Sequence, residues 1–156
     1  MHPTNSVELL WYMKINTKVR YGLRAMIEIA THSNTSGILQ KDIANNQEIP
    51  LNYLDIIVSG LRNAGLIINY GGKSSGYILS KKADQISVYD VYRAFEPELE
   101  LVNCSCPTNL CKRLDICPAK DYWFDLNTQI KSMMKRSTID NLVQHNNNML
   151  TSNISN

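Results

Sequence analysis

Residues 50–80 read PLNYLDIIVSGLRNAGLIINYGGKSSGYILS, and this stretch decides the fold. Apolar residues recur in its first half at the three- and four-residue spacing of an amphipathic helix, at Leu54, Ile57, Val58, Leu61 and Ala64. Pro50 suits the start of this helix, and Gly65 is predicted to cap its carboxyl end. Residues 66–70 and 77–80 favour strands and flank a glycine- and serine-rich segment, which predicts a hairpin with a polar, cationic tip.

Two further helices are predicted upstream, over residues 17–32 and, with Leu39 and Ile43 inward, over residues 38–46. A short helix, a tight turn and an amphipathic helix together make a helix-turn-helix. A hairpin directly after it makes a winged helix, whose second helix fits the major groove and whose hairpin tip reaches phosphates or the minor groove. The expected fold class is therefore mainly α with a small β-hairpin, a winged helix-turn-helix.

The part after the hairpin is predicted to be helical as well. Ser87 as N-cap, with Asp90 three residues later, predicts a helix that runs to about Phe95. Residues 119–136 predict a long helix, and a last short helix is expected after Ser137. The long helix has a wide apolar stripe formed by Tyr122, Leu126, Ile130 and Met133 and flanked by Trp123 and Met134. This stripe favours a helix-to-helix dimer contact at least as much as a position in the core.

Length and composition indicate one domain with an appendage, since 156 residues with 44% apolar content can form a real core. The chain has no apolar run near twenty residues, and its first twelve residues lack the features of a signal peptide, so a cytoplasmic protein with no membrane contact is expected. Met13 is a candidate for the true start. The predicted parts are an extension (1–12), a winged-helix domain (13–96), a cysteine loop (97–118), a dimerisation helix with the last short helix (119–144) and a disordered tail (145–156).

Charge is distributed unevenly along the chain. Residues 13–82 carry nine Lys or Arg against four acidic residues, whereas residues 83–156 carry seven against nine. A basic amino-terminal half suits DNA, although a solvated surface alone produces the same pattern. No enzyme is expected, because the three His residues are scattered and neither a Ser/His/Asp set nor a phosphate-binding glycine loop is present.

All four cysteines fall within fourteen residues, in the pattern C-x-C-x4-C-x5-C, at Cys104, Cys106, Cys111 and Cys117. Thiolates are the preferred ligands of zinc and of iron–sulfur clusters, and four of them on one loop can close round a metal. In a reducing cytosol such a cluster is more often metal-binding or redox-active than a disulfide framework. A thiol–disulfide sensor and unliganded thiols remain as alternatives.

Five segments in this order resemble the Rrf family of bacterial transcription regulators, the relatives of IscR, NsrR and CymR. They are MKINTKVRYGLRAM at 13–26, DIA at 42–44, IPLNYLDIIVSGLRNAGLI at 49–67, SGYILSKKADQISVYDV at 75–91 and CPAKDYW at 117–123. The resemblance covers residues 13–143. It implies a homodimeric winged-helix protein that binds a pseudo-palindromic DNA operator. Many members hold a [2Fe–2S] or [4Fe–4S] cluster on three cysteines and one further ligand.

The resemblance implies that Cys104, Cys111 and Cys117 are cluster ligands, with [2Fe–2S] expected ahead of [4Fe–4S]. The fourth ligand departs from the family pattern. The IscR type has a His three residues beyond the last cysteine, where this chain has Lys120. The NsrR type uses an acidic residue in the first helix, and residues 18–20 offer none. Cys106 is therefore the candidate fourth ligand, and a set of four thiolates would equally suit zinc.

The resemblance also implies a DNA-binding surface. Its candidate residues are Lys18, Arg20, Lys41, Leu51, Asn52, Tyr53, Asp55, Arg62, Gly72, Lys73 and Ser74. Asn52 is expected to meet an adenine edge or a phosphate, and Tyr53 a phosphate. Ile56 stands where the IscR type has a polar base-reading residue. Gly71 replaces an arginine common in the family, and Lys73 restores its charge but not its bidentate geometry.

Together these features predict a homodimeric DNA-binding regulator, a repressor, whose operator binding is controlled by an iron–sulfur cluster on the Cys104–Cys117 loop. One alternative is a regulator of the same fold that uses zinc, thiol redox chemistry or a partner enzyme as effector. A regulator without any sensor, and a small thiol-redox enzyme using Cys104 and Cys106, are the remaining alternatives.

Overall fold

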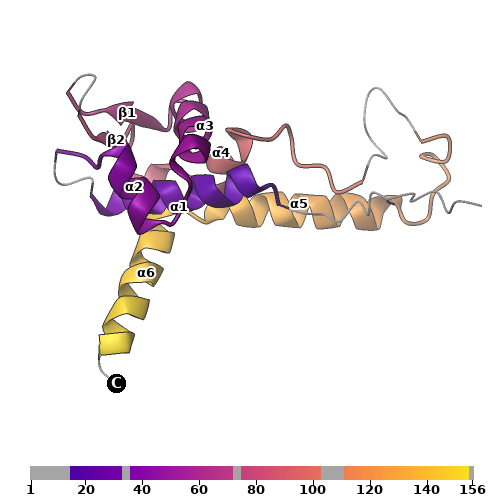
Figure 1. The fold of residues 1–156 in the computed structure, drawn as a ribbon. Helices are drawn as coiled ribbons and strands as arrows, with labels where there is room; N and C mark the ends of the chain where they lie inside the picture. Colours follow the sequence, from indigo (N-terminus) through magenta and orange to yellow (C-terminus); the bar gives the residue numbers. More distant parts are fainter. Residues whose placement is uncertain (1–14, 33–35, 72–74, 103–110, 155–156) are drawn as a thin grey trace, which may run out of the picture.

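The structure, a computed structural model, describes residues 15–32, 36–71, 75–102 and 111–154 (Figure 1). Its elements are α1 (Thr17–Thr31), α2 (Gln40–Asn46), α3 (Leu51–Asn63), β1 (Ile67–Asn69), β2 (Tyr77–Leu79), the 3-10 turn η1 (Ala83–Gln85), α4 (Val88–Arg93), α5 (Lys120–Arg136) and α6 (Ile139–Ile154). The predicted class, mainly helical with one small hairpin, is confirmed. The predictions for residues 1–12, Met13, Gly72, Lys73, Ser74, Cys104 and Cys106 lie outside the described residues.

The main core forms where α1 packs against α3. Met26 and Ile29 of α1 and Leu54 and Ile57 of α3 are completely inaccessible to solvent, and they belong to one apolar cluster. Four residues of the stripe that predicted this helix, Leu54, Ile57, Val58 and Leu61, form its buried face, whereas the fifth, Ala64, is exposed. Burial of a Leu or Ile side chain contributes roughly 1.5–3 kcal/mol, so this face holds α3 firmly on α1.

The helix-turn-helix is formed by α2, a tight turn and α3. Glu48 in the turn has a positive φ of 49°, which reverses the chain between the two helices. Pro50 occupies the N-cap of α3, one position before the first helical residue. At the other end the C-cap is Ala64, one residue before the predicted Gly65. Gly65 follows with φ +70°, in the left-handed region that glycine enters without strain.

The hairpin pairs β1 and β2 in antiparallel register, with Ile68 opposite Ile78. Ile38 lengthens it by a bridge to Tyr77, in which the two backbone N–H groups donate to the opposite carbonyls at 3.1 and 2.8 Å. The segment before α2 is thereby attached to the wing. The wing is consequently part of the helix-turn-helix unit rather than a free appendage.

The helix α4 begins with the predicted capping box, in which Ser87 and Asp90 bond reciprocally to each other's backbone N–H. It ends at Arg93 rather than near Phe95. The Phe95 ring lies instead between two helices, where a Cβ added at Gly22 of α1 or at Gly60 of α3 would come within 2.5 Å of it. Two helical glycines thus leave the room that this ring fills.

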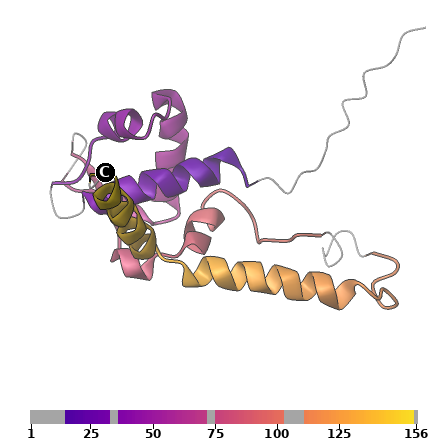
Figure 2. The same cartoon turned by 90° about the horizontal axis from the view of Figure 1, so that it is seen from below.

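The helix α5 extends away from the winged-helix unit, and residues 96–102 run beside it (Figures 1 and 2). Among the described residues, no helix has the length and the apolarity needed to span a bilayer.

The last helix is longer than expected. α6 continues to Ile154, so the predictions of a short helix and of a disordered tail from His145 are wrong. Its start is anchored by Ile139, which is fully buried and whose N–H donates to the Ile86 carbonyl at 2.9 Å. Thr138 and Asn141 cap it reciprocally. A buried, capped first turn removes the nucleation cost of a helix, which outweighs the weak helix propensity of its asparagines.

Candidate nucleic-acid interface and cysteine segment

The outward face of α3 is the candidate DNA-reading surface. Asn52, Asp55, Ile56 and Arg62 are exposed on it, at spacings of three, four and six to seven residues. The buried stripe occupies the opposite side of the helix. The packing that holds α3 therefore leaves these side chains on the solvent side of the helix, where a groove could meet them.

Two of the residues predicted to contact DNA, Tyr53 and Asp55, also have partners within the protein. Tyr53 is half-buried, and its ring meets Tyr21 of α1 edge to face, with centroids 5.5 Å apart. Asp55 accepts a hydrogen bond from Gln40 Nε2, which connects the start of α2 to α3. Leu51 is 49% exposed at the first position of α3.

A set of hydrogen bonds between α1 and the turn of the helix-turn-helix was missed by sequence reasoning. Glu28 accepts hydrogen bonds at 2.7 Å from Asn46 Nδ2 and from Gln47 Nε2. Arg24 donates to the Gln47 carbonyl and, at 3.3 Å, to Gln47 Oε1. Arg24 and Glu28 are four residues apart on the polar side of α1, the spacing of neighbours on one helix face, and that spacing was the available signal.

The predicted cationic residues do not all lie together. Lys41 belongs to α2, whose Gln40 contacts α3, and Arg62 is in the last turn of α3. Lys18 and Arg20 lie in the first turn of α1, and Lys18 is about 15 Å along the helix from Glu28 at the usual rise per residue. The structure thus brings Lys41 near the reading helix and leaves Lys18 and Arg20 at the far end of α1 from the turn.

Of the four cysteines, the structure describes two, and both have free thiols. Cys111 is exposed and Cys117 is half-buried. The Leu114 N–H donates to the Cys111 carbonyl at 3.0 Å, and the Lys120 N–H donates to the Cys117 carbonyl at 3.3 Å, so these turns lead directly into α5.

These two thiols fit a thiolate-bound metal group, since neither is used in a disulfide and Lys112 and Arg113 between them offset negative charge. Within residues 15–32, 36–71, 75–102 and 111–154, no group of three or more His, Cys, Asp or Glu side chains gathers. The other candidate ligands, Cys104 and Cys106, lie outside those ranges.

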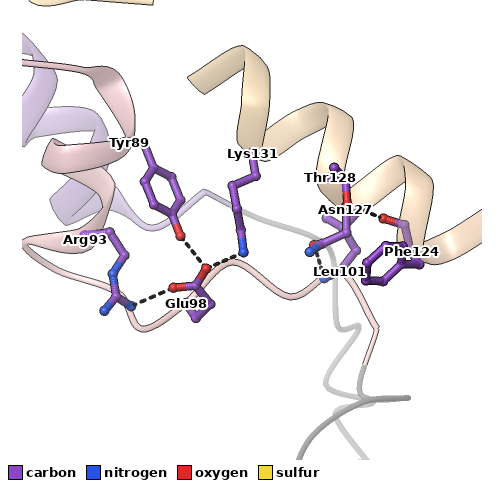
Figure 3. A network of polar contacts seen from close by, with 8 residues as sticks. All are labelled: Tyr89, Arg93, Glu98, Leu101, Phe124, Asn127, Thr128 and Lys131. Carbon is purple, nitrogen blue, oxygen red and sulfur yellow. Dashed lines mark hydrogen bonds and ion pairs between the residues drawn. The ribbon is translucent and has the colours of Figure 1, made fainter. Parts of the chain in front are cut away.

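Residues 96–102, which we call the strap, follow α4 and precede residues 103–118, the cysteine segment. Figure 3 shows the polar contacts of the strap. Glu98 at its centre accepts hydrogen bonds from the Tyr89 hydroxyl of α4, at 2.8 Å, and from Lys131 Nζ of α5. Arg93 Nη1 lies 3.9 Å from the other oxygen of Glu98. Nearer the cysteines, the Leu101 N–H donates to Asn127 Oδ1 at 3.1 Å.

Electrostatics at the strap follow from these contacts. The hydrogen bond from Lys131, and then that from Tyr89, lowers the pKa of Glu98. The pKa of Lys131 is raised by its bond to Glu98, and the pKa of Tyr89 is raised by burial and then by Glu98. All three groups therefore keep their charge state, carboxylate, ammonium and phenol, near neutral pH.

A second apolar cluster lies beneath the strap. Leu99 is 7% exposed and packs with α1, α4 and α5, through Val19, Tyr89, Tyr92 and Met134. Next to it, a cleft of about 440 Å³ lies between residues 98–102 and the first half of α5. Nothing in the sequence pointed to the strap, because it has no periodicity and no recognised motif.

The predicted apolar stripe of α5 divides into two groups. Leu126 and Ile130 are half-buried and Met134 is buried. Tyr122, Phe124 and Met133 are 59–66% exposed, and Trp123 is 37% exposed. The carboxyl-terminal half of α5 therefore packs on the winged-helix unit, whereas large apolar side chains along the helix meet solvent.

Known proteins resemble this chain over most of its length. A family described as Rrf2, iron-dependent transcriptional regulator, matches residues 15–145. IscR of Pectobacterium atrosepticum, an HTH-type transcriptional regulator, is 32% identical over 133 residues, which are 85% of this chain and 80% of that protein. Protein rrf2 of Nitratidesulfovibrio vulgaris is 33% identical over 132 residues, which are 85% and 88% of the two chains.

A solved structure supports the same assignment. CymR, the global cysteine regulator of B. subtilis, superposes with a TM-score of 0.71 at 32% identity and covers 86% of this chain and 98% of its own. The matched proteins are transcriptional regulators with the winged-helix fold and not enzymes, and the family match runs from α1 into α6. The chain therefore belongs to the Rrf2 family of DNA-binding transcriptional regulators.

Proposed function

We propose that the protein is a homodimeric repressor whose operator binding is controlled by an iron–sulfur cluster. Its ligands are Cys104, Cys111 and Cys117, with Cys106 as the fourth, and [2Fe–2S] is the expected type. The observation that carries the proposal is the pair of free thiols at Cys111 and Cys117, directly before α5. The likeness to IscR and the family description support it.

The DNA surface in this proposal consists of the outward face of α3, the adjoining α2 and the wing. Asn52 and Asp55 read base edges, and Tyr53 and Leu51 meet the backbone at the start of α3. The cations at Lys18, Arg20, Lys41, Arg62 and Lys73, with the backbone at Gly72 and Ser74, contact phosphates. A homodimer meets two half-sites of a pseudo-palindromic operator in the cytoplasm.

In this proposal the cysteine site is coupled to the DNA-binding surface through the strap and α5. A bound cluster supplies a centre that responds to redox state and to cluster supply. The carbonyl of Cys117 accepts the hydrogen bond of Lys120 at the first turn of α5, so the backbone at this ligand and α5 move together. Glu98 and Leu99 join the strap to α4 and α1, which carry the DNA-binding unit. A shift of α3 in one subunit relative to α3 in the other lowers the affinity for the operator, because both half-sites must be bound at once.

The proposal is tested on protein purified without oxygen. We expect a visible absorption band, iron and acid-labile sulfide, and operator affinity that changes when the cluster is removed. Cys111→Ser should abolish all three properties, whereas Ser132→Ala, an exposed change on α5, should abolish none. Cys106→Ser tests the fourth ligand, since a shifted absorption spectrum is expected if Cys106 coordinates. Colourless wild-type protein would contradict the proposal.

The second candidate is a regulator with zinc or free thiols in the cysteine segment. It is favoured by the likeness to CymR, a global cysteine regulator, and by the suitability of four thiolates for tetrahedral zinc. Stoichiometric zinc without iron in the purified protein would establish it. Operator affinity that changes on reversible thiol oxidation, without any metal, would indicate the thiol form.

A further inference from the structure

One large apolar side chain stands on the otherwise polar reading face of α3. Ile56 is 50% exposed, although Leu54, Ile57, Val58 and Leu61 already supply the buried side of the helix. The core therefore does not require an isoleucine at position 56. Asp55 precedes Ile56, and Asn52 lies one turn before it on the same face.

Ile56 is an isolated apolar position on this helix and not part of an apolar patch there. Leu51 is also exposed, but five helical residues separate them, which places their side chains about 140° apart around the axis. The residues three and four positions from Ile56 along the helix are Asn52, Tyr53, Ser59 and Gly60, and of these the exposed one is the amide Asn52. A polar face with a single apolar point does not suit an apolar protein partner, whereas it suits the mixed edges of base pairs.

We infer that Ile56 contacts the C5-methyl group of a thymine in the major groove and thereby selects thymine at one position of each half-site. The inference rests on α3 being the DNA-reading helix. An isoleucine can neither donate nor accept a hydrogen bond, and the thymine methyl is the apolar feature of the major-groove base edges. Four helical residues advance about 6 Å, less than two base-pair steps, so Asn52 and Ile56 address neighbouring base pairs.

The backbone that carries Ile56 is also held in place by the contacts of its neighbours. Gln40 Nε2 donates to Asp55, the residue before Ile56, and Leu54 and Ile57 on either side of this pair are fully buried. The backbone at position 56 is therefore fixed by its neighbours. A fixed side chain of defined shape discriminates a methyl group better than a mobile one.

The test uses duplexes selected by the wild-type protein from a randomised DNA library. Each thymine of the selected duplex is replaced in turn by deoxyuridine, which removes only the methyl group, and affinity is measured by fluorescence anisotropy at one fixed salt concentration. We expect about a three- to fivefold loss at one symmetric pair of thymines per operator, the size expected for one buried methyl group. Ile56→Ala should bind the thymine and uracil duplexes equally, as in a double-mutant cycle.

Two further variants sharpen the result. Ile56→Gln should lose the discrimination between thymine and uracil and select a different base at the same position. Met149→Ala, which changes an equally exposed apolar side chain on α6, should keep the wild-type discrimination. The helix α6 points away from α3 in Figure 1.

The inference is overturned if no thymine is sensitive to methyl removal, or if Ile56→Ala keeps the wild-type sensitivity. A wild-type protein that enriches no duplex would overturn the DNA-reading role of α3 together with it. The measurement is made on protein with and without its metal group. If the affinity for the operator is the same with and without the metal group, while thymine is still distinguished from uracil, the proposed function is contradicted and the inference about Ile56 is not.

Discussion

In the winged-helix unit a set of large apolar side chains forms a core closed to solvent, whereas on α5 only Met134 is buried. Ile29, Leu54 and Ile57 are fully buried, but Phe124 and Met133 are about two-thirds exposed. The first region thus has a core of its own. The second is connected to it by the buried Leu99 and Met134 and by the polar contacts of Glu98. Exposed apolar side chains such as those of α5 suit contact with another protein surface, which agrees with the proposed second subunit.

Removal of a core side chain should produce the largest effect and tests the first half of the comparison. Ile57→Ala should lower the free energy of unfolding by about 2–5 kcal/mol, because it leaves a cavity between α1 and α3. Urea denaturation measures this. Ile56→Ala on the exposed side of the same helix is the control and should change stability by less than about 0.5 kcal/mol. Equal losses in the two variants would contradict the assignment of the buried face.

Filling the space beside Phe95 should also weaken the winged-helix unit. Gly60→Ala would normally stabilise a helix by about 1 kcal/mol, but here its Cβ would come within 2.5 Å of the Phe95 ring. We expect a net loss of about 1–3 kcal/mol, measured by thermal unfolding. Phe95→Leu in combination should recover part of that loss. A stabilised Gly60→Ala protein would show that the ring is free to move.

A charge on the exposed side of α5 tests the second half of the comparison. Met133→Asp should raise the dissociation constant of the proposed homodimer by roughly tenfold or more, because it buries an unpaired carboxylate. Sedimentation at several concentrations measures this constant. Gln129→Asp places the same charge at an exposed polar position of the helix and should have a smaller effect. An unchanged dimer in the Met133 variant would place the interface elsewhere.

The smallest effect is expected at Glu98. Its folded-state pKa lies below the ordinary 4.5, so the carboxylate contributes stability above about pH 4.5 that is lost as the pH falls through the folded pKa. Glu98→Gln should therefore be less stable than wild type at pH 7, and the difference should shrink toward pH 3. Melting temperatures across that range measure it. Glu100→Gln, an exposed change on the same strap, is the control.

The winged helix was predictable because each of its elements has a local signal. The buried stripe over residues 51–63, the capping box at Ser87 and the hairpin around residues 71–76 all follow from spacing and residue type. The tail from His145 was mispredicted for a related reason. Its composition indicates disorder, but its helical state depends on the distant contact between Ile139 and Ile86.

The candidate site divides in the same way. Cys111, Cys117 and the residues of α3 were found from the sequence, because their chemistry and order are visible along the chain. Glu28, Arg24 and Glu98 were not found. Their partners include Asn46, Gln47 and Lys131, which lie 18 to 33 residues away, and no local pattern records those distances.

By itself the sequence determined the order of the main elements, the buried face of α3 and the concentration of thiols before α5. These properties depend on side-chain chemistry and on periods of two or 3.6 residues. The tertiary structure alone decided that Phe95 fills the space left by Gly22 and Gly60, and that Glu98 connects the strap to α4 and α5. Such features arise when distant segments pack, and packing is settled by three-dimensional shape and not by local sequence.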